Sequence, residues 1–444
     1  MSILRLPNYD VLDHEERNGV LRIEIVKTPG PSTCPHCGVW GGRRHGFGTK
    51  RQTFHDLPHG PTKVVLIIDR QRYRCLECQR TFMDRLPDMS DEHGMTKRLE
   101  SYVLEEAYRA TFSSVAAVVG VTEGTIRKMF KKAMESADAR RDLITPRVLG
   151  IDEVGLYRKS KRPCAVFTNI QQKTVVEIIR DRDKKSVIRF LHSLEASEVE
   201  AVTADLWDGY HHAAREVFPY ALVVADKFHV VKLVNDAMDK CRKSQNAGSE
   251  SKRRYLRGLR LPLLSRAKDI STAKDASGRE WIRSKQRQLD VIFDQFPALY
   301  DAYLCKEFFY DIYDAPTLEA AKEAFAFFES SITGPIAEHF QPVAKTIRYF
   351  EEAIFNYWHQ PFTNAWTETA NGLIRRVFDR GRGYSFDVLR SKVIHTYGSQ
   401  RLPAQRVKRT DFAYSPSLHP RTYGTDLSTL EIIPPISLES PVST

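Results

Sequence analysis

The stretch VEAVTADLWDGYHH, residues 199–212, leads from a buried strand into a helix and carries two carboxylates at the junction. Its apolar, β-branched run stops at Asp205, and Asp208 follows just before Gly209. A carboxylate at the mouth of a buried strand is costly unless a cation or a hydrogen-bond donor meets it, and ligands of α/β sheets collect at such strand ends. An Asp immediately before a helix is a good N-cap. We therefore predict a chemical role for Asp205 and a capping role for Asp208.

Strands and helices alternate around this stretch. Apolar runs bounded by turn residues predict strands at 147–157, 163–171, 174–181, 199–207 and 221–226. Amphipathic patterns predict helices at 183–195, 209–218 and 228–243. Three strands followed by alternating helices and strands is the order of a ribonuclease-H-like sheet, in which the first and fourth strands are central neighbours. Asp152, in the first strand, should then lie beside Asp205.

These two carboxylates would repel each other and would need a divalent cation between them. Oxygen ligands without a nearby cluster of Cys or His favour Mg²⁺ or Mn²⁺. Two such ions can activate an attacking hydroxyl and stabilise the leaving oxygen of a phosphodiester. This chemistry normally uses a third acidic ligand.

The third acidic ligand is expected after a long helical segment. Residues 244–360 show helical patterns without a convincing strand ladder and are predicted to form an all-helical insertion. A helix resumes in TNAWTETANGLIRRVFDRGRGYSF, residues 363–386, and its period places Glu368, Asn371, Gly372 and Arg375 on one face. We predict Glu368 as the third ligand. Gly372 would let a duplex or the sheet approach closely, and Arg375 and Arg376 would contact phosphates.

Asp226 and His229 form a second pair at a strand end. Asp226 ends the fifth predicted strand, and His229 begins the next helix. A helix cap with a packed histidine accounts for this pair as well as a histidine that contacts phosphate or the surroundings of the metal ions. In the second interpretation Asp226, His229 and Asn371 lie around the metal ligands.

Four of the seven cysteines form two C-x₂-C pairs, CPHC at 34–37 and CLEC at 75–78. Two such knuckles complete a four-sulfur structural zinc site, with Cys34, Cys37, Cys75 and Cys78 as ligands. A redox dithiol or a disulfide pair fits poorly with two copies in a reducing compartment. The 37 residues between Cys37 and Cys75 require a hairpin between the knuckles, and the alternating run at 63–75 predicts one of its strands.

The segment FSSVAAVVGVTEGTIRKMFKKAM, residues 112–134, is typical of a helix-turn-helix. Gly120 makes the turn, Thr122 caps the second helix, and Ile126 and Met129 are buried. Glu123, Thr125, Arg127 and Lys128 then remain exposed on the helix that would enter a major groove. Generic helical hairpins give the same pattern. The expected DNA contacts are Thr125, Arg127 and Lys128.

The 444-residue chain has a formal charge of +11 and 42% apolar residues, which describes a globular protein of several domains. The excess positive charge gathers in residues 242–290 and 361–409, which suggests a nucleic-acid partner, although solvated helix faces give similar runs. No run approaches the 18 apolar residues of a membrane span, and the N-terminus does not resemble a signal peptide. We expect a cytoplasmic protein that does not enter the membrane.

In their order along the chain these motifs resemble bacterial insertion-sequence transposases of the L-three family. The matching pieces are the zinc knuckles with C-x₂-C-x-R-T-F, the helix-turn-helix, G-I-D-E-V at 150–154, the run FP-x-A-x-V-V-x-D-x-F-H-V at 218–230 and T-E-x-x-N-G at 367–372. The D-x-x-H run is also similar to Mutator-like transposases. The resemblance implies an Asp, Asp, Glu triad, here Asp152, Asp205 and Glu368, on a ribonuclease-H-like domain with a helical insertion before the Glu.

The expected fold is a multidomain α+β chain. Its parts are a zinc-ribbon module at 1–90, a helix-turn-helix domain at 91–145, a ribonuclease-H-like α/β catalytic core at 146–243, the helical insertion at 244–360, the final core helices at 361–410 and a poorly ordered tail at 411–444. The expected function is that of a Mg²⁺-dependent DNA transposase that binds terminal inverted repeats and joins the element to target DNA. Two ends must be held together, so a homodimer or higher oligomer is expected. The alternatives are a DNA-binding regulator with an inactive nuclease-like domain and a structure-selective nuclease.

Overall fold

The computed structural model describes residues 4, 6–28, 33–39, 42–156, 163–245, 249–272, 281–381 and 383–399. They fall into two compact units, one within Met1–Lys128 and one within Met129–Ala404. The predicted tail at 411–444 and the end of the segment 361–410 lie outside the described residues. Within the described part of the chain, no helix combines the length and apolarity needed to cross a membrane.

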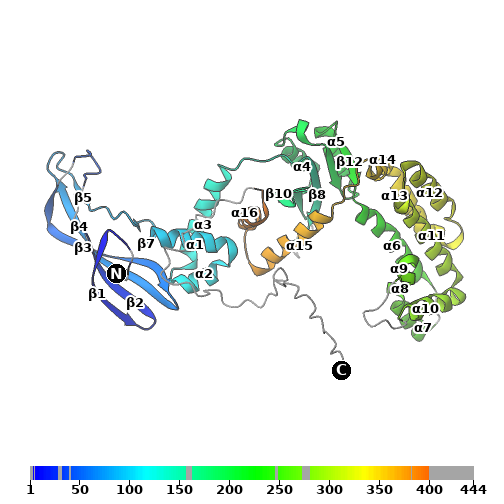
Figure 1. The fold of residues 1–444 in the computed structure, drawn as a ribbon, viewed down its shortest axis with the longest axis horizontal. Coiled ribbons are helices and arrows are strands. Elements are labelled where there is room, and N and C mark those ends of the chain that lie inside the picture. The colour runs from blue at the N-terminus through cyan, green and yellow to red at the C-terminus, as the bar shows by residue number, and fades with distance from the viewer. Residues whose placement is uncertain are drawn as a thin grey trace, which may run out of the picture. The chain divides into compact units, whose positions relative to one another are not determined.

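The first unit contains a sheet built around a long hairpin (Figure 1). Its strands are β1 (Tyr9–Arg17), β2 (Val20–Lys27), β3 (Gly42–His59), β4 (Thr62–Cys75), β5 (Thr81–Met83), β6 (Met89–Ser90) and β7 (Met95–Thr96). The order is β1-β2-β4-β3-β7-β6, and β5 pairs with β4. The hairpin of β3 and β4 occupies the interval between the two C-x₂-C pairs, as the spacing predicted. The strands β1 and β2 were not predicted. In β1 the eight residues from Asp10 to Arg17 include only two apolar ones, Val11 and Leu12.

Three helices follow the sheet: α1 (Lys97–Arg109), α2 (Phe112–Val119) and α3 (Glu123–Asp138). Each begins after a threonine whose hydroxyl accepts a backbone N–H three residues later, and for α3 this is Thr122, at 3.1 Å from the nitrogen of Thr125. Gly120 ends α2 with a φ of 81°, a conformation that favours glycine. The predicted turn and cap are confirmed. Thr125 is half-buried instead of exposed, and its hydroxyl lies 2.9 Å from that of Thr122.

The second unit is organised by a five-stranded sheet of order β10-β9-β8-β11-β12. The strands are β8 (Val148–Val154), β9 (Cys164–Asn169), β10 (Thr174–Ile179), β11 (Ala201–Ala204) and β12 (Leu222–Ala225). The helices that alternate with them are α4 (Lys184–Leu191), α5 (Asp208–Val217) and α6 (Lys227–Ser244), with a short 3₁₀ turn η1 (Ala196–Glu198) before β11. The strands β8, β11 and β12 run parallel, so the predicted adjacency of the first and fourth strands is confirmed.

Alternate residues of these strands face different layers. Leu149 and Ile151 of β8 and Val202 of β11 join a core with α4, α5 and α6. On the opposite face Val154 and Val166 pack against α15 (Ala365–Arg380) and α16 (Phe386–Tyr397). Figure 1 shows α15 running beside β8. The sheet is thus covered on both sides by helices.

The described residues between α6 and α15 are helical or lie in short connections. The elements are α7 (Glu250–Gly258), α8 (Arg260–Leu264), α9 (Ala267–Thr272), α10 (Trp281–Gln295), α11 (Pro297–Asp314), α12 (Leu318–Ser330), η2 (Gly334–Ile336), α13 (Ala337–Tyr349), α14 (Glu351–Phe355) and η3 (Asn356–Trp358). Their apolar residues belong to the same core cluster as one face of the sheet, from Leu149 to Phe355. Cys164, Cys241 and Cys305 are buried.

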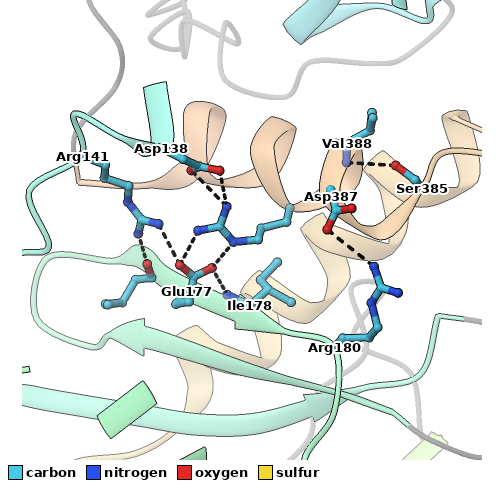
Figure 2. A network of polar contacts seen from close by, with 10 residues as sticks. Asp138, Arg141, Glu177, Ile178, Arg180, Ser385, Asp387 and Val388 are labelled. Carbon is cyan, nitrogen blue, oxygen red and sulfur yellow. Dashed lines mark hydrogen bonds and ion pairs between the residues drawn. The ribbon is translucent and has the colours of Figure 1, made fainter. Parts of the chain in front are cut away.

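A network of ion pairs joins the end of α3 to β10 and α16 (Figure 2). The Arg390 guanidinium donates to both Glu177 oxygens at 2.7 Å and to both Asp138 oxygens at 2.9 and 3.0 Å. Arg141 donates to Glu177 at 2.8 Å. Glu177 is buried, and removing one partner of a buried pair leaves an uncompensated charge. The network therefore fixes the last turn of α3 on the sheet of this unit.

Candidate active site

Three aspartates meet at one edge of the five-stranded sheet. Asp152 lies near the end of β8, Asp205 directly follows β11, and Asp226 directly follows β12. The pairing of Ala204 with Ile151 and with Ala225 brings the ends of these parallel strands together. Side chains alternate between the two faces of a strand. By this alternation all three aspartates point away from the face that carries Leu149 and Ile151. The three carboxylates therefore belong to the α15 side of the sheet.

The two carboxylates of the stretch 199–212 have different partners from those predicted. Asp205 Oδ1 accepts the Trp207 N–H at 3.0 Å. Asp208 is the first residue of α5 and caps nothing; its carboxylate accepts the Tyr349 hydroxyl at 2.8 Å and lies 3.1 Å from His212 Nε2. The capping prediction for Asp208 is wrong because the strand ends at Ala204 and the helix begins one residue earlier than predicted.

His211 holds the backbone of Asp205 from beneath. The ring is fully buried and lies tilted against Phe350, with 4.8 Å between the ring centres, and its Nε2 lies 2.7 Å from the Asp205 carbonyl oxygen. A carbonyl oxygen only accepts, so Nε2 carries the proton. Burial lowers the pKa of His211 to about 4, which keeps the ring neutral. Sequence reasoning missed this residue, since a histidine on an amphipathic helix carries no signal of its partner.

The helix α15 contacts the sheet through polar side chains. The Thr367 hydroxyl lies 2.6 Å from that of Thr168 on β9, and both side chains are fully buried. Asn371 Nδ2 donates to Asp152 Oδ2 at 2.8 Å and to the Glu153 carbonyl at 3.2 Å. These contacts place Glu368, between Thr367 and Asn371, on the side of the helix that faces the aspartates.

The acidic residues and one histidine form two groups whose possible ligand atoms lie within 4.8 Å of one another. One group is Asp152, Asp205 and His229; the other is Asp226, His229 and Glu368. Asp152 and Asp205 therefore belong to one group and Glu368 to the other, and His229 is common to both. The Nδ1–H of His229 donates to Asp226 Oδ2 at 2.9 Å, and Asp226 Oδ1 also caps α6 by accepting the Phe228 N–H. Asp226 is therefore both a helix cap and part of the cluster.

Burial and the neighbouring charges shift the pKa values of the clustered carboxylates. Burial raises the pKa of Asp152 to about 7, and the nearby Asp205 and Asp226 charges act in the same direction. Burial also raises the pKa values of Asp205 and Glu368. The hydrogen bond to Asp226 raises the pKa of His229. A cluster of this kind is stabilised by positive charge placed among its oxygens.

The glycine that permits close approach is on the sheet. A methyl group at Gly372 would meet none of the described residues within 4 Å, so the prediction that this glycine lets the sheet come near is wrong, while approach of a duplex stays a prediction. At Gly150 a methyl group would lie 2.4 Å from the Thr367 hydroxyl oxygen and 2.5 Å from that of Thr168. Arg375 and Arg376 are exposed on α15, and Arg375 is close enough to lower the pKa of Asp152.

The four cysteines of the first unit also come together. The Sγ atoms of Cys34 and Cys78 are 3.7 Å apart, those of Cys37 and Cys75 are 3.5 Å apart, and all four lie within 4.8 Å of one another. Gly38 follows the first pair with a φ of 76° and Gln79 follows the second with a φ of 58°. Four convergent thiols with two tight turns are the donor set of a structural zinc ion, with no position left for a substrate.

On the helix α3, Arg127 and Lys128 are exposed as predicted. The Arg127 guanidinium pairs with Glu123 at 2.5 Å and lies 5.5 Å from the centre of the Phe112 ring. These are exposed contacts that a stronger partner can replace at little cost.

A zinc ribbon, a helix-turn-helix and a sheet edge rich in carboxylates are the parts that the resemblance to transposases predicted. Residues 149–393 match a family model described as transposase, residues 30–78 match the zinc-finger of the transposases IS204/IS1001/IS1096/IS1165, and residues 85–134 match the helix-turn-helix domain of transposase family ISL3. The first match covers more than half of the chain. The chain belongs to the ISL3 family of insertion-sequence transposases, which confirms the resemblance seen in its motifs and implies that it binds DNA.

Two curated relatives have the same character. The transposase for insertion sequence element IS1001 of Bordetella parapertussis is 24% identical over 284 residues, which cover 62% of this chain and 69% of the relative. The transposase for insertion sequence element IS1557 of Mycobacterium tuberculosis is 24% identical over 306 residues, which cover 62% of this chain and 65% of the relative.

Proposed function

We propose that this protein is a DNA transposase that cleaves the phosphodiester at the ends of an insertion sequence and joins the freed 3′-hydroxyl to target DNA. The observation that carries the proposal is the convergence of Asp152, Asp205, Asp226, His229 and Glu368 at one end of the sheet. A regulator with an inactive nuclease-like domain has no need for such a costly cluster of buried acids.

The donor set fits a magnesium or manganese centre. Carboxylate oxygens dominate both groups, and one imidazole is tolerated by these ions, more readily by Mn²⁺. Glu368 Oε1 and Asn371 Oδ1 are buried without a hydrogen-bond partner among the described residues, so two oxygens remain for a ligand. Mg²⁺ bound here would supply activation of the attacking hydroxyl and stabilisation of the leaving oxygen.

In this proposal Asp152, Asp205 and Glu368 are the catalytic metal ligands. Asn371 holds one oxygen of Asp152, which orients the other. The His229 Nδ1–H donates a hydrogen bond to Asp226. This bond fixes the orientation of the His229 ring and therefore the position of its Nε2 atom. The sheet belongs to the ribonuclease-H-like class, and the helices between α6 and α15 are its insertion. The proposed domains are those expected from the sequence. They are the zinc-ribbon module at 1–90, the helix-turn-helix domain at 91–145, the catalytic core at 146–243 and 361–410, and the helical insertion at 244–360.

DNA recognition in this proposal uses both modules before the catalytic sheet. Thr125, Arg127 and Lys128 on α3 contact the terminal inverted repeats, and the zinc site shapes the ribbon that assists them. Arg375 and Arg376 contact the phosphates near the scissile bond. Two copies of the chain act together, because two element ends must be joined in one reaction.

The test uses labelled DNA that carries an element end, incubated with purified protein and Mg²⁺, with the cleaved strands resolved on a sequencing gel. Asp205→Asn removes a charge from the cluster, so cleavage and joining should be abolished while end binding persists. Asp208→Asn keeps an oxygen that accepts the Tyr349 hydroxyl, so it should remain active and serves as the matched control.

The assignment fails if Asp205→Asn is active, or if only Asp208→Asn is inactive. Asp152→Asn and Glu368→Gln should match Asp205→Asn, with little recovery at high Mg²⁺. Specific binding of element ends without any cleavage by the wild-type protein would instead support the regulator.

A further inference from the structure

One buried side chain, that of Asn364, contacts the immediate surroundings of all three proposed catalytic carboxylates. Asn364 precedes α15 and is fully buried. Its Nδ2 donates to the carbonyl oxygen of Ile151, the residue before Asp152, at 3.1 Å. Its Oδ1 accepts the hydroxyl of Thr203, two residues before Asp205, at 3.1 Å, and the hydroxyl of Thr367, the residue before Glu368, at 2.5 Å.

The hydrogen-bond directions in this cluster are determined by its chemistry. The Ile151 carbonyl only accepts, so the amide nitrogen faces β8 and the amide oxygen faces the two hydroxyls. The single Thr367 proton goes to Asn364, so Thr168 donates to Thr367. An aspartate would face the Ile151 carbonyl with a second acceptor, and an apolar residue would leave three buried polar groups without this partner.

The three segments that Asn364 contacts, β8, β11 and α15, differ in the other interactions that hold them in place. The strands β8 and β11 are already paired through their backbones, with Thr203 opposite Gly150. The helix α15 shares no backbone ladder with the sheet, so its position depends on side chains such as Asn364 and Thr367. Glu368 lies one helical turn after Asn364, and its backbone N–H donates to the Asn364 carbonyl at 3.1 Å. A shift of Asn364 therefore moves Glu368 relative to the aspartates.

We propose that Asn364 is a positioning residue that holds the helix of Glu368 in register with the strands of Asp152 and Asp205. This inference rests on the proposed function, because it assumes that these carboxylates bind the metal ions together. Like-charged carboxylates would drive α15 away from the sheet before the cations bind, and the Asn364 amide opposes that movement. It prepares the site for metal and does not touch the substrate.

The experiment measures Mn²⁺ binding to the full chain in the absence of DNA, by the electron paramagnetic resonance signal of the free ion. Asn364→Leu keeps the approximate volume and removes all three contacts. Its Mn²⁺ affinity should fall by about 10-fold or more, as for other residues that hold metal ligands. Cleavage should need correspondingly more Mn²⁺, while the affinity for element-end DNA stays unchanged.

A second pair of variants removes a single contact. Thr203→Val is close to isosteric and removes the hydroxyl that Asn364 accepts, so Mn²⁺ affinity should fall in part. Thr203→Ser keeps the hydroxyl and should bind Mn²⁺ as the wild type does. The matched control is Asn356→Leu, because Asn356 Nδ2 also donates to a strand carbonyl, that of Val223 at 2.9 Å, away from the carboxylates. It should lower thermal stability without changing Mn²⁺ affinity.

Asp152→Asn separates the two possible failures. If it binds Mn²⁺ as the wild type does, the proposed metal site is wrong and the proposed function fails. If it loses Mn²⁺ while folded Asn364→Leu and Thr203→Val both bind with wild-type affinity, only the positioning role of Asn364 is overturned. An Asn364→Leu protein that does not fold leaves the decision to Thr203→Val and Thr203→Ser.

Discussion

A single methyl group at Gly150 should separate α15 from the sheet. In Gly150→Ala the added carbon would lie 2.4 Å from the Thr367 hydroxyl oxygen, 2.5 Å from that of Thr168 and 2.6 Å from Ile170 Cδ1. All three distances are shorter than carbon contacts allow. The strand is held by ladders on both sides, so the helix that carries Thr367 must move away and the side chains of Thr168 and Ile170 must shift.

The cost can be worked from these contacts. Overpacking a filled core costs about 1–3 kcal/mol. Movement of α15 also breaks the buried hydrogen bond between Thr168 and Thr367, and an unsatisfied buried hydroxyl adds about 1–3 kcal/mol. We expect Gly150→Ala to lower the free energy of unfolding by about 2–6 kcal/mol, a large share of the roughly 5–15 kcal/mol typical of a domain.

The assay is urea unfolding monitored by tryptophan fluorescence, since Trp207 and Trp366 lie in the second unit together with Gly150. Gly372→Ala is the matched control: it adds the same methyl group on α15, where nothing lies within 4 Å. An alanine inside an exposed helix is more stable than glycine by up to about 1 kcal/mol, so this variant should be stabilised. A loss below about 0.5 kcal/mol in Gly150→Ala would refute the packing argument, since that is the usual effect of a surface change.

Three further changes test other parts of the chain. Cys75→Ser should lose the zinc ion, measured by atomic emission, and should loosen the knuckle end of the hairpin while the separate apolar core of the first unit persists; zinc retained at wild-type content would contradict this. Arg127→Ala should weaken element-end binding in a gel-shift assay by about 1–3 kcal/mol with an unchanged melting temperature, and unchanged affinity would exclude α3 as the reading helix. Burial lowers the pKa of Lys392 to about 7. Above that pH the folded chain has released the Lys392 proton while the unfolded chain still binds it, so the free energy of unfolding should rise from pH 7 towards 10. Lys392→Met should abolish that rise in urea titrations at several pH values, and a slope equal to that of the wild type would contradict the assignment.

Local patterns were sufficient to predict the sheet edge that carries the acids. The apolar runs before Asp205 and Asp226 are short and β-branched, and the strand order alone places Asp152 beside Asp205. The two C-x₂-C pairs likewise predicted the cysteine cluster and the hairpin between its halves, because four thiolates around one ion leave few alternatives. The cap and turn of the helix-turn-helix followed from Thr122 and Gly120.

The contacts that hold the site together could not be predicted in this way. Whether Asp208 caps α5 depends on the residue at which this helix begins. The helix begins at Asp208 itself, and the Asp208 carboxylate accepts a hydrogen bond from the Tyr349 hydroxyl. The choice between Gly150 and Gly372 as the point of close approach depends on packing between segments more than 200 residues apart. Asn364 carried no signal at all, since its three partners come from β8, β11 and α15.

The bond between Asn364 and Ile151 spans 213 residues, and this separation sets the order of events during synthesis. At about 5–20 residues per second, α15 leaves the ribosome roughly 10–40 seconds after β8. Until then the strand face that bears Thr168 and Thr203 has no helix against it, and Glu368 has not been made. A nascent chain can therefore fold its zinc ribbon and its helix-turn-helix, and bind DNA, well before Glu368 joins Asp152 and Asp205. If Glu368 is a catalytic metal ligand, as proposed, chains truncated by early termination would bind DNA without cutting it and would compete with the finished protein for the same DNA.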